Sequence, residues 1–142
     1  MNSIYDILKE KILVLDGAMG TMIQDYRFSE SDFRGSRFKD HPSPVKGNND
    51  LLSLTQPEAI KTIHEKYLEA GADIIETNTF SSTSIGMADY SMESIVYDLN
   101  FESAKIAKEA TLKYSKINPE KPRFVAGSIG PTNRTASMSP DV

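Results

Sequence analysis

Three short apolar segments, each ended by small or polar residues, constrain the fold of this chain most strongly. They are residues 12–15 (Ile-Leu-Val-Leu), 72–76 (Ala-Asp-Ile-Ile-Glu) and 123–126 (Arg-Phe-Val-Ala). Helical patterns lie between them, and such crossovers are long enough for parallel pairing. Because the carboxyl ends of parallel strands meet at the edge of the sheet where ligands bind, we predict an α/β fold with a site built from the residues that follow these segments.

The connecting segments carry local helix signals. Ser3 followed by Asp6 is a capping pattern and predicts a short helix over residues 3–9. A capping residue followed by Pro and Glu at residues 55–58 begins a second helix, which Gly71 ends. Apolar residues at helical spacing from 96 to 114 predict a third helix that stops before Asn118-Pro119.

Residues 27–49 predict a long loop. They mix both charges with glycine and proline and show no sustained period. A loop of this length is too long for a routine connection, so we expect it to have a function. Phe28, Phe33 and Phe38 recur every five residues, which fits neither a helix nor a strand. We expect these rings to hold the loop to the surface beneath it.

Composition excludes several classes of partner. The chain has 142 residues, 39% of them apolar, with 16 Lys+Arg against 20 Asp+Glu. It is long enough for one domain with a core, and its net charge of −4 gives no large basic face for nucleic acid or anionic lipid. No apolar run reaches the ~18 residues that a membrane span needs. The charged first eleven residues do not look like a signal peptide, so we predict a soluble, cytoplasmic protein.

The absence of cysteine excludes disulfides, a cysteine nucleophile and a thiolate-bound metal within this chain. His41 has no second histidine or cysteine near it in the sequence, which gives metal binding little support. His64 shares a helix face with Ile60, so we expect it to be packed in the core. The serine- and threonine-rich residues 81–84 lack a neighbouring histidine and acid, and are better suited to capping the next helix.

The turn after the first segment, residues 16–21, has two glycines that let the backbone approach a ligand. Exposed N–H groups in such a turn can hold a carboxylate or phosphate. Two roles stay open for Asp16: it accepts hydrogen bonds from a ligand ammonium, or it caps the turn.

Polar residues also follow the other two segments. Because side chains alternate along a strand, about two of residues 76–79 point to the rim. Glu76 either faces a ligand or pairs with a lysine or arginine of the next unit. Ser128 lies in a turn, residues 127–131, that suits close backbone approach or a tight barrel corner.

Residues 12–24, 47–58, 72–80 and 126–133 together resemble the N-terminal homocysteine-binding module of cobalamin-dependent methionine synthases. The resemblance implies a (β/α)8 TIM-type barrel, of which residues 1–142 would be the first part, about three βα units. Asp16 matches the acid expected to hold the homocysteine amino group. The other residues that it assigns to the amino-acid end or to the rim are Gly17, Ala18, Thr21, Glu76, Thr77, Asn78 and Ser128.

The resemblance also implies the chemistry. Homocysteine thiolate binds a zinc ion held by three cysteines on later strands and attacks the methyl group of methylcobalamin, giving methionine. Other modules of the same polypeptide, which bind folate and cobalamin, remethylate the cofactor from methyltetrahydrofolate. Since no cysteine is present here, we expect this chain alone to hold neither zinc nor cobalamin and to be inactive.

Two other hypotheses stay open. A homocysteine methyltransferase of the same fold could use betaine or S-methylmethionine as donor, although residues 47–58 favour methionine synthase. The chain could also be a non-catalytic α/β binding or assembly module. An incomplete barrel exposes strand edges and apolar faces, so we further predict self-association.

Overall fold

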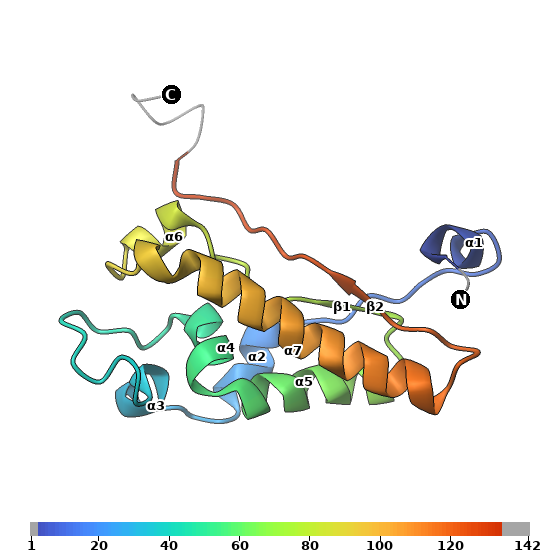
Figure 1. The fold of residues 1–142 in the computed structure, drawn as a ribbon, viewed down its shortest axis with the longest axis horizontal. Coiled ribbons are helices and arrows are strands. Elements are labelled where there is room, and N and C mark those ends of the chain that lie inside the picture. The colour runs from blue at the N-terminus through green and yellow to red at the C-terminus, as the bar shows by residue number, and fades with distance from the viewer. Residues whose placement is uncertain (1–2, 135–142) are drawn as a thin grey trace.

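The computed structural model describes residues 3–134. Helices lie between the strands along the chain, as the sequence predicts, but within residues 3–134 two strands form in place of the three predicted (Figure 1). The elements are α1 (Ile4–Leu8), α2 (Met19–Gln24), α3 (Glu30–Arg34), the 3₁₀ helix η1 (Asn49–Leu51), α4 (Leu52–Thr55), α5 (Pro57–Ala70), β1 (Ile74–Glu76), α6 (Ser84–Ala88), the 3₁₀ helix η2 (Glu93–Ile95), α7 (Val96–Ile117) and β2 (Phe124–Ala126).

Strands β1 and β2 form a parallel pair, with Ile74 opposite Phe124 and Glu76 opposite Ala126. The crossover between them contains α7, which packs against α5 and both strands (Figure 1). The predicted parallel pairing of the second and third segments is therefore confirmed, and with it the α/β class. Two paired strands do not by themselves make a barrel, which stays an expectation.

The first predicted strand is wrong in extent and in burial. Residues 12–15 form one isolated parallel bridge, between Leu15 and Ile74, instead of a ladder. Backbone hydrogen bonds from Asp73 and Ile74 to Val14 O hold this end of the segment beside β1. The side chains of Ile12 and Val14 are 90% and 56% exposed. An apolar run is buried only where other elements cover it, and within residues 3–134 these side chains remain open to solvent.

The core lies between the helices and the sheet. One cluster joins α4, α5 and α7 and contains the fully buried Leu52, Ile60, Ile63 and Leu99. A second, smaller cluster packs β1 against α5 and α7, where two alanines of α7 let the backbones approach closely. Its buried members are Leu68, Ala72, Ile75, Ala107 and Ala110.

Local signals set most helix boundaries where we predicted them. The predicted capping role of Thr55 is wrong, because Thr55 is the last residue of α4, its hydroxyl donates to Leu51 O, and no side chain caps the start of α5. Ser3 and Asp6 form the capping box of α1. Helix α5 begins at Pro57 and ends at Gly71, whose φ of 113° is left-handed and favours glycine. Thr83 caps α6 by accepting the Gly86 N–H, which confirms the capping role predicted for residues 81–84. Within residues 3–134, no helix is both long and apolar enough to cross a membrane.

The segment predicted as a loop, residues 27–49, is more ordered than its composition suggests. It contains α3, which begins with a second capping box from Ser29 to Asp32. Phe33 is buried, and Phe28 and Phe38 pack against the main core, so the aromatic residues do hold the segment down. Glu30 closes the loop by accepting the Val45 and Lys46 N–H groups.

Candidate functional site

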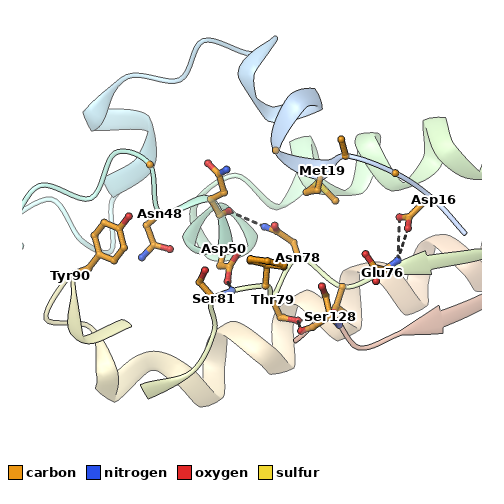
Figure 2. Close-up of a pocket in the computed structure, with 17 residues that line it drawn as sticks. Asp16, Met19, Asn48, Asp50, Glu76, Asn78, Thr79, Ser81, Tyr90 and Ser128 are labelled. Carbon is orange, nitrogen blue, oxygen red and sulfur yellow. Dashed lines mark hydrogen bonds between the residues drawn. The ribbon is translucent and has the colours of Figure 1, made fainter. Parts of the chain in front are cut away.

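A cavity of about 430 Å³ lies at the carboxyl ends of the strands (Figure 2). Three segments and two single residues, far apart in the sequence, line it: residues 16–20, 47–50 and 76–81, together with Tyr90 and Ser128. Every residue that the sequence placed at the site lines this cavity except Thr21, which is exposed and outside its wall. The expectation that strand-end motifs converge is therefore met by three segments, and the loop supplies a fourth.

Asp16 is tied to the end of β1. Its two carboxylate oxygens each lie 3.1 Å from the Glu76 backbone nitrogen and share its N–H. Partial burial, with repulsion from the Glu76 carboxylate, raises the pKa of Asp16 from 3.8 to about 6, although the hydrogen bond from Glu76 opposes this. The Asp16 carboxylate thus accepts a hydrogen bond from the end of the neighbouring strand β1 instead of capping its own turn. It still lines the cavity (Figure 2).

Glu76 lines the same end of the cavity and, within residues 3–134, makes no ion pair with a lysine or arginine. The described cavity wall contains three carboxylates, those of Asp16, Asp50 and Glu76, and no lysine, arginine or histidine. Carboxylates grouped around a low-dielectric cavity favour a ligand with a positive group. The geometry therefore supports the ligand-facing interpretation of Glu76.

Asn78 joins the rim to the helices beneath it. Its Nδ2 donates to Asn49 O at 2.9 Å and to Ser53 Oγ at 3.1 Å. Its backbone carbonyl accepts from Ser103 Oγ of α7 at 3.2 Å. Asn78 lines the cavity, but its amide donors are engaged with the protein.

Thr77, Thr79 and Ser128 join the ends of the two strands. The Ser128 N–H donates to Thr77 Oγ1 at 3.0 Å, and Thr79 Oγ1 donates to Ser128 O at 2.8 Å. The two threonine hydroxyls lie 2.6 Å apart. Side chains from the segment after β1 thus fix the backbone of the turn after β2.

Sequence patterns missed the far end of the cavity, where Asn48, Asp50 and Tyr90 lie (Figure 2). Asp50 is 5% exposed, and its Oδ2 accepts the Ser81 N–H at 2.7 Å and the Ser82 hydroxyl at 2.9 Å. Burial raises the pKa of Asp50. Asn48 and Asp50 belong to no periodic element, so the only sequence signals for them were the length of the loop and the resemblance of residues 47–58. Neither signal covers Tyr90.

The two histidines have packing roles. His41 Nε2 donates to the Tyr90 carbonyl at 2.8 Å and so links the loop to the segment before η2. His64 is fully buried on α5, which confirms its predicted place in the core. Neither histidine lines the cavity.

The residues of this chain do not fit the zinc site that the resemblance implies. The sequence has no cysteine, and residues 3–134 contain no group of three or more histidine, aspartate or glutamate side chains arranged to hold a metal ion. We therefore derive no step of the reaction through zinc from the residues of this chain.

Comparisons with known proteins agree with one another. The family model for homocysteine S-methyltransferase matches residues 13–142. The metallated form of the homocysteine methyltransferase MmuM from Escherichia coli matches with 26% identity and a TM-score of 0.69, over 92% of this chain and 42% of that one. Its oxidised form matches with 28% identity and a TM-score of 0.70, over 92% and 41%. The chain thus spans less than half the length of these solved structures.

Proposed function

Because this chain belongs to the homocysteine S-methyltransferase family, we propose that its cavity binds the amino-acid end of homocysteine. The observation that carries the proposal is the pair of carboxylates, Asp16 and Glu76, at one end of a cavity whose described wall has no cationic side chain. Homocysteine carries one ammonium group, and it can supply the missing positive charge.

The ammonium would lie between Asp16 and Glu76. Its positive charge relieves the repulsion between the two carboxylates and favours the ionised form of Asp16, whose pKa is otherwise raised to about 6. Charge-assisted hydrogen bonds of this kind are about twice as strong as neutral ones. Gly17, Ala18, Thr77, Asn78 and Ser128 complete the proposed amino-acid site because they line the same cavity; Thr21 belongs to it only through the resemblance.

For the methyl donor, we propose methylcobalamin, and hence a role as the homocysteine-binding part of a methionine synthase. The support is the resemblance of residues 47–58, four of which, residues 47–50, lie on the cavity wall. Methylcobalamin would supply the methyl group to the homocysteine sulfur, and the residues of this chain would hold the amino-acid end of homocysteine in place for that transfer. The zinc ligands and the cobalamin- and folate-binding modules would come from sequence outside residues 1–142, and the cytoplasm is the proposed location.

The two enzyme hypotheses differ in the donor. A transferase that uses betaine or S-methylmethionine would need the same site for homocysteine, so the acidic pair does not separate it from a methionine synthase. The third hypothesis, a non-catalytic binding or assembly module, has less support because the family is one of methyltransferases.

Methionine formation by the full-length protein tests the proposal. Supplied with homocysteine and one donor at a time, it should form methionine from methylcobalamin and not from betaine or S-methylmethionine. Asp16→Ala should lower kcat/KM for homocysteine at least tenfold, the effect of losing a charge-assisted contact. The matched control is Asp25→Ala, which removes an exposed carboxylate outside the cavity and should change nothing. Normal turnover by Asp16→Ala would exclude the role given to this carboxylate.

A further inference from the structure

The contacts among Thr77, Thr79 and Ser128 form a closed ring in which each proton can be assigned. The Ser128 backbone nitrogen can only donate, so Thr77 Oγ1 accepts its proton. The Ser128 carbonyl can only accept, so Thr79 uses its single hydroxyl proton on that oxygen. The remaining 2.6 Å contact must then be a hydrogen bond from the Thr77 hydroxyl to Thr79 Oγ1.

The ring leaves neither threonine with a proton for a ligand. Thr77 and Thr79 are 7% and 6% exposed, and both hydroxyl protons lie on bonds within the ring. Ser128 is held only through its backbone: within residues 3–134 its hydroxyl makes no hydrogen bond, and the residue lines the cavity. The buried threonines thus hold the backbone of Ser128, and the Ser128 hydroxyl is left free to contact a ligand.

Further contacts extend the junction on both sides of the ring. The Thr77 N–H donates to Ala126 O at 2.9 Å, and the Gly130 N–H donates to Phe80 O at 2.8 Å. A Cβ atom at Gly130 would lie 2.6 Å from Phe80 O, too close for any residue other than glycine without a shift of the backbone. The end of β2 and the turn after it are therefore held against the segment that follows β1 at three successive points, with the ring in the middle.

We propose that Thr77 and Thr79 are positioning residues, which set Ser128 and its turn against the cavity without contacting the substrate themselves. This proposal rests on the proposed function, in that homocysteine is the ligand whose binding depends on the ring. Thr77 then acts on the substrate indirectly, through Ser128, instead of contacting it. Thr79 is added to the residues on which binding depends.

Thr77→Val tests the ring in the full-length protein, because valine keeps the shape of threonine and removes the hydroxyl. The Ser128 N–H then loses its acceptor. We expect KM for homocysteine to rise about tenfold, as for loss of one buried hydrogen bond, with kcat within about twofold. Thr77→Ser keeps the hydroxyl and should retain a KM close to that of the wild type. A wild-type KM in Thr77→Val, or equal defects in the serine and valine variants, would overturn the proposal.

Thr111→Val is the matched control. Thr111 is as buried as Thr77, but its hydroxyl donates to Lys108 O within α7, away from the cavity. It should change KM little even if it lowers the melting temperature. In a double-mutant cycle, Thr77→Val should add little to the KM of Ser128→Ala, because both act through the same side chain. Full additivity of the two effects would contradict the proposal.

Hydrogen exchange separates failure of this inference from failure of the proposed function. Without any substrate, the Ser128 amide should exchange slowly in the wild type and in Thr77→Ser, and faster in Thr77→Val. Fast exchange in the wild type would disprove the ring itself. A wild type that shows slow exchange and does not bind homocysteine would disprove the proposed function, and with it the substrate role of the ring.

Discussion

At the scale of single residues, Asp16, which we propose binds the ligand, lowers the stability of the fold at neutral pH. Burial raises the pKa of Asp16 to about 6, above the ordinary 3.8, so folding favours its protonated form. Its contribution to stability is fully present below pH 3.8 and is lost as the pH rises to about 6. At neutral pH the ionised carboxylate therefore opposes folding, as is common for groups kept for binding.

Asp16→Asn should show this cost directly. Asparagine keeps an acceptor for the Glu76 N–H and removes the charge. We expect the free energy of unfolding at pH 7.5 to rise by on the order of 1 kcal/mol, a value reduced for the solvent that reaches the half-buried group. At pH 3.5 the variant should match the wild type. Thermal unfolding at both pH values measures the effect, and a variant less stable than the wild type at pH 7.5 would speak against it.

His64 has the opposite pH dependence. It is fully buried, neither ring nitrogen has a hydrogen-bond partner within residues 3–134, and burial lowers its pKa to about 4 from 6.5. A base whose pKa is lowered by folding contributes stability above pH 6.5, and this is lost as the pH falls toward 4. An apolar side chain of similar size at position 64 would fill the same space without burying polar ring atoms.

His64→Leu should therefore gain about 1 kcal/mol of stability at pH 7, since it removes two buried polar atoms without partners. The wild type should lose stability between pH 6.5 and 4 more steeply than this variant. Urea unfolding at pH 7 and at pH 4.5 provides the comparison. Equal pH dependence in the two proteins would show that His64 finds a partner in solution.

At the scale of elements, the sequence predicts those features that depend on interactions between residues close together in the chain. The capping box of Ser3 and Asp6 placed the start of α1, and Gly71 placed the end of α5, because these residues bond within their own helix. The strand predicted at residues 12–15 was wrong in extent because strand formation depends on distant partners, and within residues 3–134 this segment makes a single bridge, between Leu15 and Ile74. Asn48 and Asp50 were missed for the same reason, since only tertiary packing brings them to the cavity wall.

Arg123 illustrates how one residue joins two elements at the end of the sheet opposite the cavity. Its Nη1 donates to Leu68 O at 3.1 Å and to Ala72 O, so it links the start of β2 to the end of α5. Arg123→Met keeps most of the aliphatic stem and should cost about 2 kcal/mol of stability. KM for homocysteine should not change, because Ser128 lies at the other end of β2. Chemical denaturation measures the first effect, and a raised KM would show that the two ends are coupled.

At the scale of the whole molecule, apolar side chains are exposed beside the sheet. Ile12, Val14, Leu15 and Ile129 all have large exposed fractions, and within residues 3–134 β2 pairs only with β1. An unpaired strand edge next to exposed apolar groups favours association with another chain. These features agree with the short span of the chain relative to the solved structures that it matches.

Residues 1–142 expressed alone should therefore self-associate. Light scattering should give a mass well above the 15.8 kDa of one chain. Val14→Lys should shift the population toward monomer, because it places a charge on the exposed face. A stable wild-type monomer would contradict the prediction.

The central claim is that the acidic end of the cavity binds the ammonium of homocysteine. Calorimetric titration of the full-length protein with homocysteine and with its deaminated analogue, 4-sulfanylbutanoate, tests this most directly, because both ligands keep the thiol and the carboxylate. We expect homocysteine to bind at least about tenfold more tightly, as a charge-assisted contact requires. Equal affinity for the two ligands would show that Asp16 and Glu76 do not hold the ammonium.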